Sequence, residues 1–222
     1  MSKSQVVVVS NCSATKTQAP ILHKDAFADA WIDSDGRAQA GRQFINAPRV
    51  AAKDLYAGRE HLIIKQAIGA ARAKGVSVAW YIVSAGYGVV KETDQLLPYD
   101  QSFVNMPQAT KRDVAARLSI SAHLLVVLEA APHCAPGAEC SHDHALVALA
   151  ADYLEAAQLR ERAGDGKLSR VHLYGPESYR GDWEKRTQLG HFEPATTEAA
   201  SREGAGLVWL RGAMLSKRLG SL

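Results

Sequence analysis

Small polar side chains, a thiol and a lysine follow the first apolar run of the sequence. After the valines at residues 6–9, the chain continues with Ser10, Cys12, Ser13, Thr15 and Lys16. Backbone N–H groups in such a turn form an anion-binding nest, which hydroxyls and a lysine complete for phosphate or carboxylate. The stretch lacks the glycines of a P-loop or a dinucleotide fingerprint. In the alternative interpretation, Cys12 is a small buried side chain and Ser13 a turn residue.

A nucleophilic role for Cys12 makes a further demand on its surroundings. A reactive thiol needs a lowered pKa, and Lys16 or a helix amino terminus are the groups near enough in the sequence to lower it. We therefore keep Cys12 as a candidate catalytic residue beside its structural interpretation.

A second candidate loop follows the apolar run at residues 76–83. It comprises Ser84, Ala85, Gly86, Tyr87 and Gly88. The two glycines carry no side chain and allow close approach of a ligand to the backbone, and the tyrosine can stack on a base or donate through its hydroxyl. The alternative is a tight strand-to-helix turn with a packed tyrosine. Ligands of open α/β sheets bind beyond the carboxyl ends of strands, which favours a site made by both loops.

Acidic residues after the second loop are candidates for proton transfer. Asp100 follows Pro98 and Tyr99, and Glu92 and Asp94 lie upstream. We favour Asp100 as the general acid or base, because aromatic neighbours would partly desolvate it and raise its pKa, with Glu92 next. Acidic loop residues are also commonly just solvated.

Metal-binding side chains are densest in a loop at residues 131–144. They are His133, Cys134, Cys140, His142 and His144. Four ligands of this type satisfy tetrahedral zinc, although the spacing matches no standard zinc finger and histidine-rich loops are often merely exposed. Zinc is therefore the cofactor that the sequence suggests.

The pattern of strands and helices that must position these residues predicts an α/β fold. Apolar runs predict strands at 5–10, 76–83, 123–128 and 171–174, and helical spacing predicts helices at 47–74 with a break near Gly58, 107–118, 143–162 and 196–202. The segment from residue 207 begins a final strand or helix. We predict a single domain over residues 1–222, with a Rossmann-like, mainly parallel sheet flanked by helices and a Cys/His-rich loop insertion at 131–144.

Composition restricts the function classes. The net charge of +3 is too small to predict nucleic-acid binding, although it permits an anionic ligand. Three cysteines, no signal-peptide pattern and no apolar run near 20 residues favour a reducing, cytoplasmic setting without membrane contact.

Four motifs in order carry a resemblance to known families. They are Ser10-x-Cys12-Ser13-Ala14-x-Lys16, Ala47-Pro48 through Leu55-Tyr56-x-Gly58-Arg59, Ile82-Val83-Ser84-Ala85-Gly86-Tyr87-Gly88 and Pro98-Tyr99-Asp100-x-x-Phe103. Over about the first 120 residues the chain is similar to the peroxide-stress protein YaaA family. It also resembles domains associated with queuine tRNA-ribosyltransferase-like, 7-deazaguanine-inserting DNA-modification proteins.

The resemblance implies a Rossmann-like domain linked to nucleotide or nucleic-acid metabolism, often in phage or defence settings. It also implies one pocket lined by the motif residues, which are Cys12, Ser13, Lys16, Tyr56, Arg59, Ser84, Gly86, Tyr87, Tyr99 and Asp100. It assigns no catalytic roles to them.

The leading hypothesis is an enzyme that acts on a nucleotide, a nucleoside or a modified base. The glycosidic bond is the bond that we suggest it cleaves or forms. A second hypothesis is a DNA-binding or DNA-protecting module without catalysis. Its basic face would be made of Arg180, Lys185, Arg186, Arg211, Lys217 and Arg218. A third is a protein that sequesters a nucleotide in the same pocket without turning it over.

Overall fold

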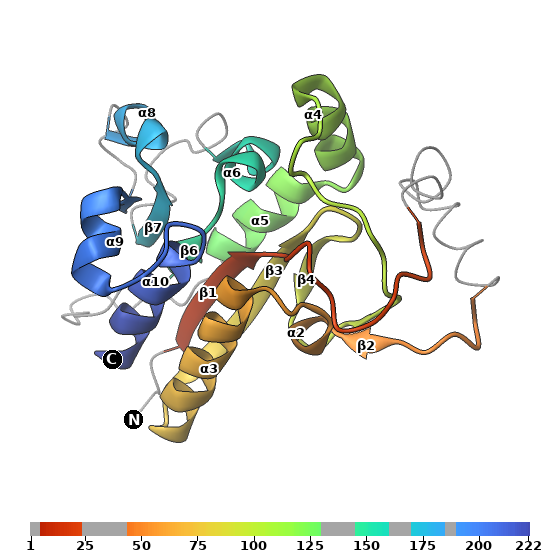
Figure 1. The fold of residues 1–222 in the computed structure, drawn as a ribbon, viewed down its shortest axis with the longest axis horizontal. Helices are drawn as coiled ribbons and strands as arrows, with labels where there is room; N and C mark the ends of the chain where they lie inside the picture. The colour runs from red at the N-terminus through yellow and green to blue at the C-terminus, as the bar shows by residue number, and fades with distance from the viewer. Residues whose placement is uncertain (1–4, 24–43, 130–144, 160–169, 185–189) are drawn as a thin grey trace.

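The central strand of the fold is β1 (Gln5–Asn11). Its four consecutive valines are almost completely buried, which fits a strand covered on both faces in a parallel sheet. The computed structural model describes residues 5–23, 44–129, 145–159, 170–184 and 190–222. Figure 1 shows β1 in the middle of the sheet with helices on either side.

In the described residues the main sheet has six strands, in the order β4-β3-β1-β6-β7-β8. The other strands are β3 (Ser77–Ser84), β4 (Gly88–Lys91), β6 (Ala145–Ala148), β7 (Val171–Pro176) and β8 (His191–Ala195). All neighbours pair in parallel except β3 and β4. A separate antiparallel pair joins β2 (Val50–Ala51) to β5 (Gln95–Leu96).

Helices cover both faces of the sheet. They are α2 (Ala52–Leu55), α3 (Arg59–Ala73), α4 (Gln108–Arg117), α5 (Ile120–Glu129), α6 (Ala151–Ala157), α8 (Arg180–Glu184), α9 (Thr197–Glu203) and α10 (Leu210–Gly220), with a 3₁₀ turn η2 (Glu177–Tyr179). On one face α3 packs against α10, and on the other α5 packs against α6 (Figure 1). The predicted α/β fold with a mainly parallel sheet is thus confirmed.

The predicted strand at 123–128 is wrong, because these residues belong to α5. Ile120, Leu124 and Leu128 are buried, whereas Val126 is 64% exposed. This burial recurs every four residues, as on the inward face of a helix. A short apolar run fits a strand or a buried helix equally well, so periodicity alone did not separate them.

The predicted helix at 143–162 is also wrong over its first part. Residues Ala145–Ala148 form β6, which lies between β1 and β7 and is buried throughout. Alanine favours helices, but a strand enclosed by neighbours and covered on both faces accepts small apolar residues in succession. The helix α6 begins only at Ala151.

Smaller differences concern the connecting segments. The predicted break at Gly58 is confirmed by the separation of α2 from α3, but the helical part begins at Ala52 because Val50 and Ala51 pair with β5. The stretch at 178–193, predicted as a loop, contains α8 and the start of the edge strand β8. The final segment is the helix α10.

The loop after β3 is a hairpin turn and not a strand-to-helix turn. Ser84 pairs with Gly88, and the chain returns antiparallel as β4. Gly88 has φ of 76°, in the left-handed region that glycine adopts without strain. A Cβ at this position would also lie 2.9 Å from the carbonyl oxygen of Leu118.

His61 joins α3 to the sheet. Its ring lies 4.8 Å from that of Trp80 and 5.5 Å from that of Tyr56, and it is 2% exposed. Its Nε2 donates to the carbonyl oxygen of Lys53 at 3.0 Å, while Nδ1 is buried without a hydrogen-bond partner among the described residues. Burial therefore lowers the pKa of His61 to about 4.

None of the helices in the described part of the chain combines the length and the apolar character needed to cross a bilayer.

Gly88→Ala is expected to destabilise the protein by more than about 2 kcal/mol, because a left-handed alanine costs about 1–2 kcal/mol and the Leu118 carbonyl must also move. The matched control is Gly69→Ala on α3, where no atom lies within 4 Å of the new Cβ. This change is expected to stabilise by about 0.5–1 kcal/mol. Urea unfolding of both variants checks the opposite signs, and equal effects would contradict the hairpin geometry.

Acidification is expected to destabilise the fold through His61. A histidine whose folded pKa lies below its unfolded value of 6.5 favours the unfolded state as the pH falls. Between pH 6.5 and about 4, His61 should cost about 3 kcal/mol. We expect the free energy of unfolding of His61→Phe to fall less over this range than that of the wild type. Parallel curves for the two proteins would show that His61 does not titrate in this way.

Candidate functional site

The carboxyl ends of β1 and β3 lie side by side. The pairing of Ser10 with Ile82 and Asn11 with Val83 runs to the last residue of β1, and the Cys12 N–H donates to the Val83 carbonyl at 2.9 Å. The loops that follow the two strands therefore begin next to each other, as the sequence predicted.

Backbone hydrogen bonds then hold the loop at residues 12–23 between two other segments. The Ala57 N–H donates to the Thr15 carbonyl, and the Thr17 N–H donates to the Leu55 carbonyl, each at 2.9 Å. Further along, the Ile21 N–H donates to the Pro98 carbonyl at 2.8 Å. These contacts place Tyr56 on one side of the loop and Tyr99 on the other.

Ser13 is packed at the start of α3. Its hydroxyl accepts from the Thr15 N–H at 3.1 Å, which tightens the turn after β1. A Cβ on Gly58 would overlap the Ser13 side chain, so glycine is required for this approach. Thr15 itself is exposed.

Lys16 lies over the rings of Tyr99 and Tyr56. Its Nζ is 4.5 Å from the ring centroid of Tyr99 and 6.0 Å from that of Tyr56. It donates to the carbonyl oxygens of Ser13 at 3.2 Å and Ala14 at 3.4 Å, and it forms no ion pair with any described carboxylate. Burial lowers the pKa of Lys16 despite the opposing effects of Cys12 and Asp100.

A chain of buried hydroxyls lies beneath the lysine. Ser84 Oγ accepts from the N–H groups of Gly86 at 3.2 Å and Tyr87 at 3.1 Å, and lies 2.6 Å from the Tyr99 hydroxyl. With its acceptor sites used, Ser84 donates to Tyr99, which in turn donates to the Tyr56 hydroxyl at 2.9 Å. Burial raises the pKa of Tyr56 and Tyr99, so both stay protonated.

Asp100 lies at the edge of this cluster. Its charge acts on Lys16, and its Oδ2 is 3.6 Å from Nδ1 of His23. Its Oδ1 is buried and has no hydrogen-bond partner among the described residues. The Asp100 side chain is nevertheless 32% exposed, so water or a ligand can reach the carboxylate group from its exposed side.

Two further predicted residues are near the cluster, but their polar atoms are already engaged. The Cys12 thiol is buried and lies 3.0 Å from the Tyr153 hydroxyl. The Tyr87 hydroxyl donates to the Leu97 carbonyl at 3.1 Å and accepts from the Leu97 N–H at 3.2 Å. What Tyr87 offers a ligand is its half-buried ring, 5.3 Å from that of Tyr99.

Other predicted residues serve the framework. Ser10 is buried and accepts from the Trp80 indole at 3.0 Å, which ties β1 to β3. Ala85, Gly86 and Gly88 are buried in the hairpin turn.

Glu92 and Arg59 lie apart from the tyrosine cluster. Glu92 pairs with Arg72, and its N–H donates to the carbonyl of Trp80, four residues or about 13 Å before the end of β3. The guanidinium of Arg59 stacks over the ring of Trp209 at 4.1 Å. The structure therefore does not bring Glu92 to this cluster, because β4 carries the chain back from the carboxyl end of β3.

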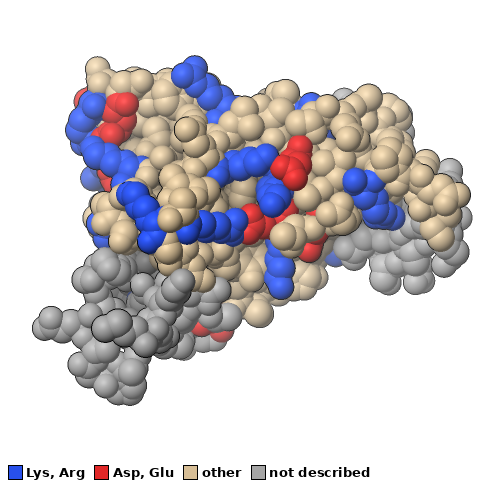
Figure 2. All heavy atoms as spheres, turned by 90° about the horizontal axis from the view of Figure 1, so that it is seen from below, with Lys and Arg blue, Asp and Glu red and all other residues tan. Residues whose placement is uncertain are grey.

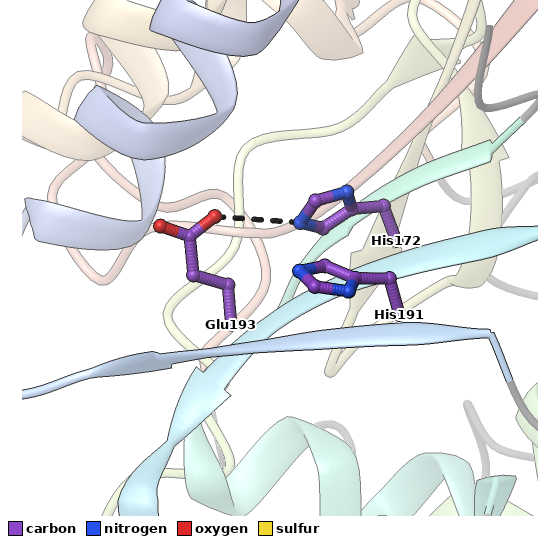
Figure 3. Close-up of side chains that lie close together, drawn as sticks. All are labelled: His172, His191 and Glu193. Atoms are coloured by element: carbon purple, nitrogen blue, oxygen red, sulfur yellow. Dashed lines mark ion pairs between the residues drawn. The ribbon is translucent and has the colours of Figure 1, made fainter. Parts of the chain in front are cut away.

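The predicted zinc ligands at residues 133–144 lie outside the described residues. The described part instead brings together His172 of β7 with His191 and Glu193 of β8 (Figure 3). Sequence reasoning missed this group because its members lie about 20 residues apart. The signal available was two short alternations, His172-x-Tyr174 and His191-x-Glu193, of which the second stood in a segment predicted as a loop.

The predicted basic face is largely neutralised in the described residues. Arg180 pairs with Glu177, Arg211 with Glu60, and Lys217 with Glu203. Lys185 and Arg186 lie outside the described part. Figure 2 shows one face of the molecule, on which Lys and Arg are interspersed with Asp and Glu.

Comparison with known proteins matches part of the chain to a family model. Residues 46–130, less than half of the 222-residue chain, match the model of a family of unknown function, DUF6884. The chain matches no curated protein and no solved structure. The matched segment includes Tyr56, Ser84, Tyr99 and Asp100, whereas Cys12 and Lys16 lie outside it.

Tyr99→Phe tests the hydroxyl chain. Removing the central hydroxyl leaves the buried oxygens of Ser84 and Tyr56 with one partner fewer each, and we expect a destabilisation of about 1–3 kcal/mol. The control is Tyr81→Phe on the same strand as Ser84, since the described contacts give the Tyr81 hydroxyl no hydrogen bond. Its effect should stay within about 0.5 kcal/mol in urea unfolding. Similar values for the two variants would refute the chain.

Proposed function

We propose that this chain is an enzyme that acts on a nucleotide, a nucleoside or a modified nucleobase bound at the carboxyl ends of β1 and β3. The observation that carries this proposal is Lys16, a partly buried ammonium group over two tyrosine rings that forms no ion pair with a described carboxylate.

The position of Lys16 supports an anionic ligand. Desolvation of an ammonium group is unfavourable unless an opposite charge compensates it. Here carbonyl oxygens, ring faces and the charge of Asp100, which forms no ion pair with Lys16, do not offset the effect of burial. A phosphate bound at Lys16 would supply the missing charge. The exposed Thr15 and the half-buried Ser13 lie in the same turn and would add hydroxyl donors.

The groups around Lys16 support a nucleotide-type ligand over a bare anion. In the proposed arrangement the half-buried ring of Tyr87 stacks on the base, and Asp100 lies toward the sugar. The resemblance to the YaaA and deazaguanine-inserting families supports the same ligand class. It also supports a role in nucleic-acid modification, stress or phage defence. We include a cytoplasmic location in the proposal.

Asp100 is the group that we propose for acid–base chemistry. Its partly exposed carboxylate takes a proton from a water molecule, whose oxygen bonds to the sugar carbon as the bond from that carbon to the base breaks. The departing base takes up a proton from solvent. The engagement of Cys12 by Tyr153 and of Glu92 by Arg72 leaves Asp100 as the best placed of the three predicted catalytic residues.

The second candidate function is nucleotide sequestration without turnover. It is favoured by the hydroxyls of Tyr56, Tyr99 and Ser84, because their hydrogen bonds to one another hold them in place for binding and leave none of them committed to chemistry.

Binding is tested with a panel of nucleoside mono-, di- and triphosphates, deazapurine nucleotides and the free bases, by thermal shift and calorimetry. Lys16→Met should weaken the binding of phosphate-bearing ligands by about 10- to 100-fold, which is the equivalent of one charge-assisted hydrogen bond. Lys91→Met removes an exposed lysine of β4 and should change nothing. Binding should also weaken as the pH rises, because Lys16 loses its proton earlier than an ordinary lysine. A panel with no ligand, or equal affinity in both variants, would refute the site.

Turnover is tested with Asp100→Asn on whichever ligand binds. We expect this variant to retain binding and to lose product formation by more than about 100-fold, which is the usual contribution of a general acid or base. Ligand that binds the wild type tightly and is recovered unchanged would favour sequestration.

A further inference from the structure

The last two strands of the sheet present three metal-binding side chains on one face. In the parallel pairing of β7 with β8, His172 lies opposite His191 and Tyr174 lies opposite Glu193. Side chains two residues apart on a strand point to the same face, so His172, His191 and Glu193 project together. Figure 3 shows the two imidazoles and the carboxylate facing one another.

The spacing of the ligand atoms is close to that of a metal site. Nε2 of His172 is 3.4 Å from Oε2 of Glu193, and the three ligand atoms all lie within 4.8 Å of one another. Bonds of about 2.1 Å in tetrahedral geometry separate two ligands by about 3.4 Å. One edge of the tetrahedron therefore already has the required length. The two distances to the His191 nitrogen are also within 4.8 Å, and His191 is exposed and Glu193 half-buried, which leaves their side chains room to adjust.

We propose that His172, His191 and Glu193 bind a divalent first-row transition metal of the zinc class, distinct from the Lys16 site. Two imidazoles and one carboxylate are a ligand set that suits such ions. Three protein ligands leave a coordination position open for water or an anion.

The surroundings support an open site. A hollow of about 420 Å³ lies between this face of the sheet and the helices α9 and α10, and both His172 and Glu193 line it. Arg202, Glu203, Lys217 and Arg218 also line the hollow, and Glu203 pairs with both Arg202 and Lys217. Arg202 lies 3.4 Å from the other carboxylate oxygen of Glu193 and would orient it as an outer-shell partner.

The competing interpretation is an ion pair that only fastens the sheet edge. His172 also stacks on Tyr174 at 4.6 Å and lies edge-on to His191 at 4.3 Å, contacts that need no metal. The two interpretations differ in one measurable respect, because only a metal site gains stability and a spectroscopic signal when metal is added.

The experiment uses the full chain carrying Cys134→Ser and Cys140→Ser, which removes the thiols of the loop at 131–144. After chelation and dialysis it is titrated with Co²⁺ and then Zn²⁺. We expect one equivalent of Co²⁺ with the visible d–d absorption of a tetrahedral ion and no thiolate charge-transfer band, and displacement by Zn²⁺. Failure of this chain to bind metal would overturn the proposal.

The ligands are then tested one at a time. His191→Ala and Glu193→Gln should each weaken metal binding by more than the about 10- to 100-fold that loss of an outer-shell partner costs. His123→Ala, which removes an exposed histidine on α5, is the matched control. His191 is itself exposed, so its removal leaves the core intact. Metal affinity that is unchanged in both His191→Ala and Glu193→Gln would place the ion elsewhere and overturn the proposal.

Discussion

The parallel hydrogen bonding of β1 to β3 is the constraint on which the rest of the site depends. It holds residues that are about 70 positions apart in the sequence at one edge of the sheet, and it continues past β1 into the Cys12 N–H. Both loops therefore start from fixed, neighbouring points. The buried hydrogen bond between Trp80 and Ser10 joins the same two strands through their side chains. A shift of this register by one residue would move every side chain of β1 to the other face and disrupt the site.

The polar groups at this edge follow from the need to satisfy buried donors and acceptors. The Ser84 hydroxyl closes the hairpin turn by accepting hydrogen bonds from two N–H groups. It therefore donates its own hydrogen bond to the Tyr99 hydroxyl, which donates to the Tyr56 hydroxyl. The rings of these tyrosines then form the surface beneath Lys16. The lysine is held by the backbone bonds of Thr15 and Thr17 to the segment at residues 55–57. Local turn chemistry and the proposed anion site are thus parts of one hydrogen-bonded unit.

The two proposed sites use different physical devices. At the Lys16 site a charge is partly desolvated without forming an ion pair with a described carboxylate, whereas at β7 and β8 imidazoles and a carboxylate converge within reach of one ion. The first lies beyond the carboxyl ends of central strands, where ligands of open α/β sheets usually bind. The second lies on a face of the sheet, next to a hollow that residues of α9 and α10 line. The two share no residue, so either proposal stands without the other.

The sequence by itself determined the fold class, the strands β1, β3 and β7, and the meeting of two loops at one edge. The run of valines and the glycine-bounded apolar run are local signals that need no partner to be recognised. Tertiary structure decided the rest. α5 and β6 have short apolar sequences that suit either element, and only their neighbours in the fold made one a helix and the other an enclosed strand. Likewise, the antiparallel return of β4 places Glu92 away from the tyrosine cluster. The register of β7 and β8 places His172 beside His191 and Glu193. Spacing along a chain does not encode which strand will lie beside which, because that is settled by burial of the whole core.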